Sequence, residues 1–388
     1  MIISRTPFRV SLAGGGSDFA EYYRRRPGNV VTMAIDYYMY VTVNRRFDDT
    51  IRVSYTRTEI VDRVDELQHD LIRECMKLTG LTSGLEITTI ADLPAGIGLG
   101  SSSTLTVGVL NALHAFNGEW RTPAELARQA CEIETEVLCK PIGKQDQYIA
   151  AFGGLQDVSF LPDGSVSVHP FVCSPDLRQK LVDRLLLFYT GMRREAGTIL
   201  GEARQRLEAR ADSRAVVDDL VAVAASLREA ILAGHVDRVG ALLDESWRLK
   251  KQMASNVSNG HLDAIYRAAL EAGAVGGKIA GAGGGGCLLL FAPRKRHDAV
   301  RAAMAAAGLR EVPFAIEPEG SRIIHYSQDR QELLQRSPSR ALKVSAAKAG
   351  VMARIHAARA GTGAGVPAAG AGAGVAIALK DARPQQAG

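Results

Sequence analysis

Residues 94–105, PAGIGLGSSSTL, combine three glycines with three consecutive serines. Glycines let backbone N–H groups approach a ligand, because no Cβ stands in the way. The apolar residues that follow recur at helical spacing, so a helix is predicted to begin at the serines and to add free N–H groups and a positive dipole end. The stretch therefore predicts an anion site. The alternative is a Gly-rich loop with a serine helix cap; a Walker A loop is excluded because no Gly-Lys-Ser/Thr occurs.

A second Gly-rich stretch, residues 6–19, reads TPFRVSLAGGGSDF. It is predicted to be a strand that carries Arg9 and ends in three glycines followed by Ser17 and Asp18. For Asp18 two interpretations remain open. It could cap a helix at 20–26, or it could bind the hydroxyl groups of a sugar.

A third stretch, KIAGAGGGGC at 278–287, matches the pattern GxGxxG. A dinucleotide-binding turn should follow a strand and open a helix, whereas these glycines are predicted to follow a helix and precede a strand. The context therefore disfavours a nicotinamide dehydrogenase. The glycines fit either a tight helix-to-strand turn or a close approach of the backbone to another segment or to a ligand.

Candidate carboxylates lie on and just after the helix predicted at 123–139, which opens with a Thr-Pro-Ala-Glu capping box. Asp146 lies between two glutamines in KPIGKQDQ and is predicted to lie in a loop, where a carboxylate suits the acceptance of a hydroxyl proton. The alternative is a solvated loop aspartate. Upstream, Glu132, Glu134 and Glu136 are candidates to face the serines and hold Mg²⁺, which prefers oxygen ligands.

Composition limits the class of protein. The chain has 388 residues, 46% hydrophobic and 23% charged, which suits two soluble lobes. No signal peptide or apolar run of about 20 residues is present, and the five cysteines form no zinc or disulfide pattern. The last 58 residues hold eight of the 47 basic and two of the 42 acidic side chains, so residues 1–330 are nearly neutral. These features predict a cytoplasmic protein that binds neither nucleic acid nor membrane.

Strands and helices are predicted from their periodicity and turn signals. The predicted strands lie at 2–6, 9–13, 30–35, 38–44, 51–55, 85–91, 152–160, 184–190, 287–291, 312–316 and 322–327. Helices are predicted at 61–78, after the serines, and at 123–139, 195–211, 214–233, 236–255 and 261–272. Strands and helices form separate runs, which favours an α+β fold. The basic, Gly/Ala-rich tail at 331–388 is predicted to be disordered.

The three Gly-rich stretches, in this order, resemble the motifs of the GHMP small-molecule kinases, which include galactokinase, homoserine kinase, mevalonate kinase and phosphomevalonate kinase. PFRVSLAGGGSD resembles the first motif, PAGIGLGSSST the phosphate loop and KIAGAGGGGC the third motif. The similarity spans about residues 1–330. It implies a two-lobe fold, with a lobe like domain 2 of ribosomal protein S5 at 1–170 and a ferredoxin-like lobe at 171–330.

The resemblance also implies roles for individual residues. Asp146 matches the catalytic aspartate and Arg9 the basic residue beside it, which would favour the ionised carboxylate. Mg²⁺ would be bound by Ser102, with Ser101 as the alternative, and by Glu134, with Glu136 as the alternative. ATP would contact Pro94, Gly96, Gly98, Leu99, Gly100, Ser101, Ser102 and Ser103. The acceptor substrate would contact Gly15, Gly16, Ser17, Asp18, Gly283 and Gly284.

In detail the chain looks most like the D-glycero-D-manno-heptose 7-phosphate kinases, through AGGGSD, PIGKQDQYIAAFGG and GGKIAGAGGGG. Galactokinases carry Glu and His where this chain has Gly15 and Gly16, which argues against galactose. The implied reaction is ATP-dependent phosphorylation of the C1 hydroxyl of heptose 7-phosphate by a monomer or homodimer. The alternatives are an L-fucose or other sugar 1-kinase, and a non-catalytic sensor that binds sugar and ATP. For the phosphate of the substrate, the candidates are Arg193, Arg194 and the arginines at 24–26.

Overall fold

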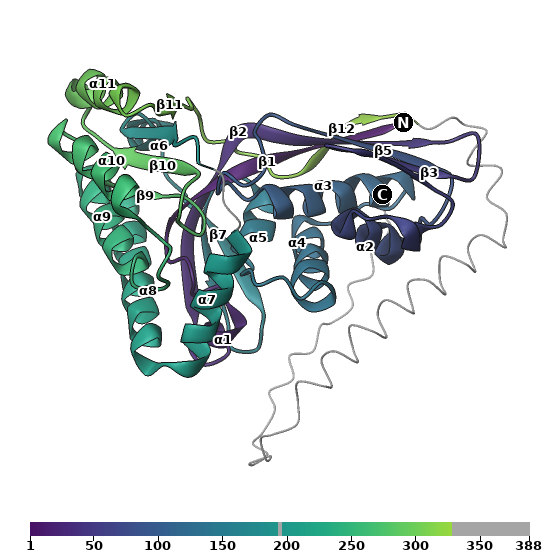
Figure 1. The fold of residues 1–388 in the computed structure, drawn as a ribbon, viewed down its shortest axis with the longest axis horizontal. Coiled ribbons are helices and arrows are strands. Elements are labelled where there is room, and N and C mark those ends of the chain that lie inside the picture. The colour runs from purple at the N-terminus through teal and green to yellow at the C-terminus, as the bar shows by residue number, and fades with distance from the viewer. Residues whose placement is uncertain (193–195, 328–388) are drawn as a thin grey trace, which may run out of the picture.

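Two long antiparallel strands form the backbone of the first lobe (Figure 1). The computed structural model describes residues 1–192 and 196–327. Strands β1 (Ile2–Ala13) and β2 (Gly28–Arg45) are each continuous where the sequence predicted two strands, because register shifts after Pro7 and Ser11 absorb the irregular positions. The second half of β1 carries Arg9 and leads directly into the Gly-rich residues 14–16.

The first sheet has the order β12-β1-β2-β5-β3-β4, and β6 and β7 extend it beside the first half of β2. All pairs are antiparallel except β3 with β5. The remaining strands of this sheet are β3 (Ile51–Ser54), β4 (Thr58–Val61), β5 (Leu85–Ala91), β6 (Leu155–Phe160), β7 (Val166–Pro170) and β12 (Arg322–Tyr326).

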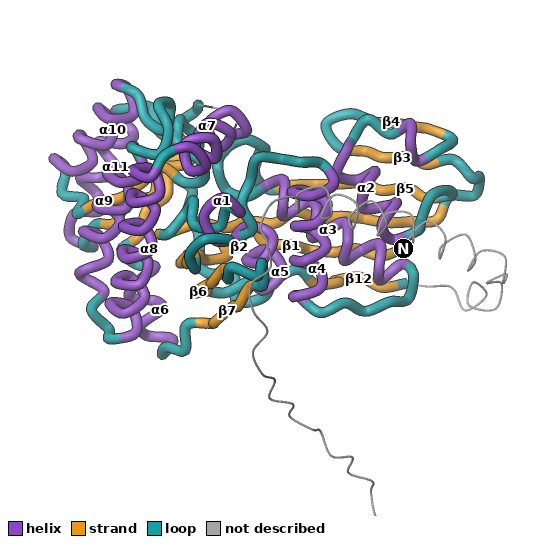
Figure 2. Tube along the Cα trace, turned by 90° about the horizontal axis from the view of Figure 1, so that it is seen from below, coloured by secondary structure: helices purple, strands orange, loops and turns teal. Residues whose placement is uncertain are grey.

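Helices cover one face of this sheet, as the view from below shows (Figure 2). Helix α3 (Ser101–Phe116) packs on β1 and β2 and is buried on several faces, as its apolar sequence predicts. Around it lie α2 (Asp70–Thr79), α4 (Pro123–Cys131), which continues as a π-helical segment (Glu132–Val137), and α5 (Gln145–Phe152). Helix α1 (Ala20–Tyr23) lies apart from them, against helix α7 (Ala196–Ala209) (Figure 1).

The second lobe contains an antiparallel sheet of order β11-β8-β10-β9. Its strands are β8 (Leu185–Tyr189), β9 (Gly276–Ile279), β10 (Cys287–Phe291) and β11 (Arg310–Glu311). Its helices are α6 (Pro175–Val182), α7 (Ala196–Ala209), α8 (Ala211–Leu232), α9 (Val239–Lys250), α10 (Gly260–Glu271) and α11 (His297–Ala306). Short 3₁₀ turns lie at Val64–Glu66, Val236–Arg238 and Arg294–Arg296.

Strand β10 joins the cores of the two lobes. Its alternating side chains enter different clusters, with Leu289 in the first and Leu288 in the second. The chain returns to the first lobe at its end, because β12 pairs with β1 although it lies inside the range predicted for the second domain. The tail predicted to be disordered, 331–388, lies outside the described residues.

Several predicted elements are confirmed. Strand β5 has the predicted bounds, and the capping box is present: Thr122 Oγ1 accepts from the Glu125 N–H at 3.2 Å and Glu125 Oε2 accepts from the Thr122 N–H at 2.8 Å. The two-lobe α+β fold agrees with the prediction.

Several local predictions are wrong. Residues 312–316, which the structure describes, do not form the predicted strand, since β11 ends at Glu311 and only an isolated bridge forms at Ile316. Residues 61–78 do not form one helix, since strand β4 and a 3₁₀ turn precede α2, which begins after its cap His69. Thr58 and Ile60 favour the strand that pairs with β3. Asp146 lies in the first turn of α5 rather than in a loop. The glycines of the third motif follow strand β9, which contains Lys278 and Ile279, rather than following a helix directly.

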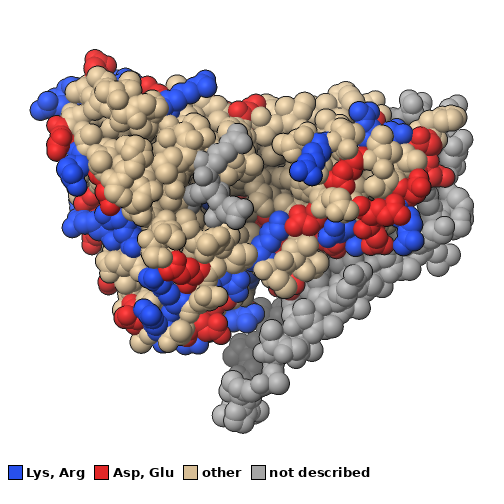
Figure 3. Space-filling view, in the orientation of Figure 1, with Lys and Arg blue, Asp and Glu red and all other residues tan. Residues whose placement is uncertain are grey.

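The visible face carries Lys and Arg side chains interspersed with Asp and Glu, around a large uncharged centre (Figure 3). This mixture agrees with the near neutrality of residues 1–330. Among the described residues, no helix is both long and apolar enough to cross a membrane.

Candidate active site

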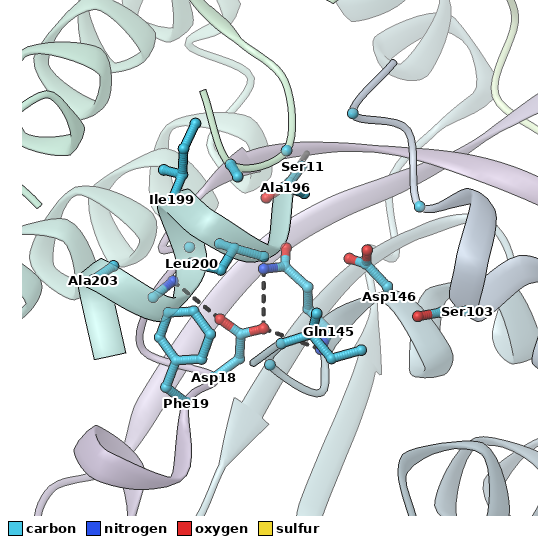
Figure 4. A pocket seen from close by; sticks show the side chains of 18 of the residues that line it. Ser11, Asp18, Phe19, Ser103, Gln145, Asp146, Ala196, Ile199, Leu200 and Ala203 are labelled. Carbon is cyan, nitrogen blue, oxygen red and sulfur yellow. Dashed lines mark hydrogen bonds between the residues drawn. The ribbon is translucent and has the colours of Figure 1, made fainter. Parts of the chain in front are cut away.

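A cavity of about 220 Å³ brings the predicted motifs together (Figure 4). Its walls come from β1, the loop at 14–18, the phosphate loop and start of α3, the start of α5, and helices α7 and α9. Eleven of the predicted site residues line it: Arg9, Gly15, Gly16, Asp18, Gly96, Gly98, Gly100, Ser101, Ser102, Ser103 and Asp146.

Arg9 and Asp146 form a two-pronged ion pair in this cavity. Arg9 Nε donates to Asp146 Oδ1 at 2.7 Å and Arg9 Nη2 donates to Oδ2 at 2.6 Å. The third guanidinium nitrogen, Nη1, donates to the carbonyl of Gly98 at 2.6 Å. Such a fork fixes the plane of the carboxylate as well as its position. Because Arg9 is only 5% exposed, Asp146 is held rigidly against the phosphate loop.

The phosphate loop is built from left-handed glycines. Gly96, Gly98 and Gly100 all have φ near +83°, a region that favours glycine. Gly100 is the N-cap of α3, so the helix begins at Ser101 as the sequence predicts. A Cβ at Gly100 would lie 3.2 Å from Arg9 Cγ and 3.4 Å from Asp146 Oδ2. The loop therefore presents a helix N-terminus, which attracts anions, directly beside the ion pair.

Glu134 lies behind the serines and is fully buried. It accepts from Ser102 Oγ at 2.7 Å, Ser103 Oγ at 2.8 Å and Gln147 Nε2 at 2.5 Å. Burial raises the pKa of Glu134, and the two serine hydrogen bonds and that of Gln147 oppose this rise. Of the two serines predicted as alternatives, Ser102 is therefore the one that contacts Glu134.

Hydroxyl and carboxylate oxygens are suitable ligands for Mg²⁺, which usually keeps several waters and takes further oxygens from nucleotide phosphates. Ser102 is exposed to the cavity and is backed by the Glu134 carboxylate, so this pair fits the ion. Within residues 1–192 and 196–327, no group of three or more His, Cys, Asp or Glu side chains gathers to form a metal site of its own.

Asp18 lies on the opposite side of the cavity and is 3% exposed. Its Oδ1 accepts from the Gly16 N–H at 3.0 Å, and its Oδ2 accepts from Gln145 N at 3.2 Å and Gln145 Nε2 at 3.0 Å. The cap of α1 is Phe19, so the interpretation of Asp18 as the cap of that helix is wrong. Burial and the nearby Asp146 charge raise the pKa of Asp18, and the hydrogen bonds from Gly16 and Gln145 lower it.

The other predicted residues lie outside the cavity lining. Leu99 is buried in the core, and its carbonyl accepts from the Arg9 N–H at 3.1 Å. Ser17 Oγ donates to the Gly14 carbonyl at 2.7 Å and so closes the first motif on itself. Pro94, Gly283 and Gly284 do not line the cavity, although Gly281 and Ala282 of the third motif do.

The third motif packs against the phosphate loop. The Cys287 N–H donates to the Ile97 carbonyl at 3.0 Å, and a Cβ at Gly286 would lie 2.3 Å from that same oxygen. At Gly283 a Cβ would lie 2.6 Å from the Val257 carbonyl oxygen. These glycines therefore permit close backbone contacts, which was one of the two interpretations of this stretch.

Sequence reasoning missed several cavity residues, of which three matter most for the site. Gln145 and Gly143 lie beside Asp18, and Lys250, at the end of α9, lines the wall made by the second lobe. Lys250 Nζ also donates to the Gly281 carbonyl. The arginines at 24–26 are not among the lining residues, and Arg193 and Arg194 lie outside the described residues. Lys250 lies outside all three motifs and gave no local signal in the sequence.

Known proteins share this architecture. Residues 66–154 match the model of the GHMP kinases N terminal domain, and residues 227–309 match that of the GHMP kinases C terminal domain. The chain is 32% identical to D-glycero-alpha-D-manno-heptose 7-phosphate kinase from Campylobacter jejuni, over 82% of this chain and 97% of that protein. It is 28% identical to the bifunctional fucokinase/GDP-fucose pyrophosphorylase of Arabidopsis thaliana, over 74% of this chain and 29% of that protein.

Among solved structures, a D-glycero-D-manno-heptose 1-phosphate kinase from Bacteroides thetaiotaomicron superposes with a TM-score of 0.71 at 26% identity. The superposition covers 84% of this chain and 100% of that one. The cavity, its three motifs and these similarities agree, and the chain belongs to the GHMP kinases, as a phosphotransferase that acts on a sugar hydroxyl.

Proposed function

We propose that this kinase transfers the γ-phosphoryl group of ATP to the C1 hydroxyl of D-glycero-D-manno-heptose 7-phosphate and so forms the 1,7-bisphosphate, toward nucleotide-activated heptose. The observation that carries the proposal is the Arg9–Asp146 fork, which lies between the phosphate loop and Asp18. A donor phosphate on the loop and a sugar hydroxyl near Asp18 would both reach Asp146. The Campylobacter relative supports the choice of sugar.

The chain's own residues would act on the acceptor hydroxyl. Asp146 orients this hydroxyl and takes its proton while the sugar oxygen bonds to the γ-phosphorus and the bond to the ADP oxygen breaks. ADP leaves with that electron pair, and Asp146 then releases the proton to water. Arg9 holds the carboxylate in place throughout. Mg²⁺, held by Ser102 with Glu134, would neutralise charge on the phosphates.

An acceptor that already carries a phosphate, here at C7, calls for a cation to bind that group, and Lys250 is our candidate. Its side chain lines the cavity, where Nζ donates to the Gly281 carbonyl, and the residue is only 9% exposed. A partly buried ammonium strengthens its attraction to a phosphate, because the local dielectric constant is lower than that of water. Lys250 is therefore our candidate for the substrate phosphate among the described residues.

The reaction is tested by measuring ADP release from ATP and Mg²⁺ with heptose 7-phosphate, the unphosphorylated heptose, L-fucose and galactose. We expect turnover of heptose 7-phosphate, with the new phosphate at C1 by ³¹P NMR. Turnover of free fucose with none of heptose 7-phosphate would instead support the L-fucose kinase alternative. Binding of ATP and sugar without any turnover would support a sensor.

The phosphate subsite is tested separately with Lys250→Met. The KM for heptose 7-phosphate should rise at least about tenfold, since a charge-assisted hydrogen bond is worth about 1.5–3 kcal/mol. The KM for ATP should stay unchanged. Lys251→Met is the matched control, because Lys251 pairs with Asp263 outside the cavity. An equal effect of both variants would argue against the subsite.

A further inference from the structure

One buried polar atom of the cavity has no hydrogen-bond partner among the described residues. It is Oε1, the side-chain carbonyl oxygen of Gln145. Gln145 lines the cavity one position before Asp146, and its amide points across to Asp18 (Figure 4). A buried acceptor without a donor costs about 1–3 kcal/mol, so an atom of this kind calls for an explanation.

The orientation of this amide is fixed by its neighbour. Both oxygens of Asp18 accept from backbone N–H groups, of Gly16 and of Gln145, and the Gln145 side chain turns its own donor, Nε2, to Oδ2 at 3.0 Å. Oε1 must then point away from Asp18. Asp18 cannot shift to release the amide, because the N–H groups of Gly16 and Gln145 also hold it.

Close packing supports the same geometry. A Cβ on Gly143 would lie 1.9 Å from Asp18 Oδ2, so the loop before α5 can approach the carboxylate only with glycine at this position. The Asp18–Gln145 pair is thus held by the backbone at both ends. In this pair Oε1 is the one polar side-chain atom left without a partner within the part of the chain that the structure describes.

We propose that Gln145 Oε1 accepts a hydrogen bond from the sugar hydroxyl on C2, next to the carbon that is phosphorylated. This inference rests on the proposed function for the identity of the reacting hydroxyl. Asp146 would meet the C1 hydroxyl, and Gln145 lines the same cavity with its amide on Asp18, the proposed sugar side, so we assign its oxygen to the hydroxyl next to C1. Gln145 is therefore a specificity-determining residue.

The consequence is selectivity for a sugar that offers a donor at C2. An acceptor lacking this hydroxyl would leave Oε1 unpaired in a closed site, and polar sites reject such analogues strongly. At about 1–3 kcal/mol for one unpaired group, the expected loss in kcat/KM is about 5- to 150-fold.

The test combines substitution with substrate modification. Wild type and Gln145→Met are each assayed with heptose 7-phosphate and with its 2-deoxy analogue. Wild type should lose about 5- to 150-fold in kcat/KM with the analogue. Gln145→Met should be slow with both substrates, with little further loss on removal of the 2-hydroxyl. If the 2-deoxy analogue lowered kcat/KM of Gln145→Met by the same factor as in wild type, the proposal would be wrong.

Gln147→Met is the matched control, because Gln147 donates to Glu134 instead of facing the sugar. It should keep the full 2-deoxy penalty even if it is slower. Gln145→Leu replaces Gln145→Met if the latter does not fold. If wild type uses another sugar, the proposed function fails, and the same comparison with that sugar and its 2-deoxy form still decides the role of Gln145.

Discussion

The two halves of the cavity, which in our proposal bind the phosphoryl donor and the sugar acceptor, are built in different ways. The donor half consists of the phosphate loop at 96–103 with Glu134 behind it, and backbone N–H groups and hydroxyls of one loop–helix junction dominate it. The acceptor half consists of Asp18, Gly143, Gln145 and Lys250. These residues come from three segments far apart in the sequence.

This contrast predicts which ligand is affected by substitutions in each half. A loop of left-handed glycines at a helix start binds phosphate through its main chain, so it suits any nucleotide kinase. The acceptor half reads its ligand through side chains that are held by neighbours across the cavity. Changes in the donor half should therefore affect ATP and Mg²⁺, and changes in the acceptor half should affect the sugar.

The residue between the halves should show the largest effect. Asp146→Asn keeps the shape but removes the charge and the proton acceptor. We expect kcat to fall at least about 100-fold, as for loss of a positioned acid–base group. ATP binding, measured by calorimetry, should be preserved, because the phosphate loop is intact. Near-normal turnover would remove Asp146 from its assigned role.

Gly143→Ala should be next, with its effect confined to the acceptor half. The new Cβ would fall within 1.9 Å of Asp18 Oδ2, so the carboxylate and the Gln145 amide must move. A displacement of about 1 Å in a positioned group can cost about 100-fold in rate. Steady-state kinetics should show the loss with the sugar varied, and an unchanged KM for ATP.

The control for this glycine is Gly201→Ala on α7, where a Cβ would meet nothing within 4 Å. That variant should keep full activity and unfold at the same or a slightly higher temperature, because Ala favours a helix over Gly. If Gly143→Ala behaved like Gly201→Ala, the tight contact with Asp18 would have no functional meaning.

The same contrast governs what the sequence could predict. The phosphate loop, Arg9 and Asp146 lie in local motifs, and the structure brings them together. Gln145 stands inside one of those motifs, but its role depends on Asp18, which is 127 positions away. Lys250 has no motif at all. The start of the helix predicted at 61–78 was misplaced for a local reason, because residues 58–61 form a hairpin strand with β3.

Glu134→Gln should sharpen the contrast from the donor side. The substitution keeps the size of the side chain but removes the charge behind Ser102. We expect the Mg²⁺ concentration for half-maximal rate to rise about 10- to 100-fold, the usual cost of altering groups around a metal. The KM for the sugar should change little. Glu132→Gln, on the same π-helical segment but paired with Arg128, should leave the Mg²⁺ dependence unaltered.

A smaller effect, on stability, is expected at Lys278. Its Nζ donates to the Leu12 carbonyl at 3.0 Å, at the base of the acceptor loop, and the residue is 2% exposed. Burial, with Arg9 nearby, lowers the pKa of Lys278 from 10.5 to about 7. Between these values the unfolded chain binds a proton that the folded chain does not, so stability rises with pH.

Denaturant unfolding of wild type and Lys278→Met at several pH values would measure this contribution. The stability of wild type relative to the variant should increase from pH 7 toward pH 10, by at most about 1.4 kcal/mol per pH unit. A constant difference over this range would mean that Lys278 keeps its proton on folding. The donor half, which contains no lysine, should contribute nothing to this pH dependence.

The smallest effect is expected from deletion of residues 331–388. Strand β12 ends at Tyr326 and pairs with β1, and the Ser327 N–H still reaches the Met1 carbonyl at 2.9 Å, so every described contact of both halves survives the deletion. Activity and melting temperature should match those of the full chain. Extending the deletion to residue 321 removes β12 and leaves the edge of β1 unpaired, on the strand that carries Arg9. That longer deletion should lower both quantities, because the edge strand fixes the element that holds the ion pair.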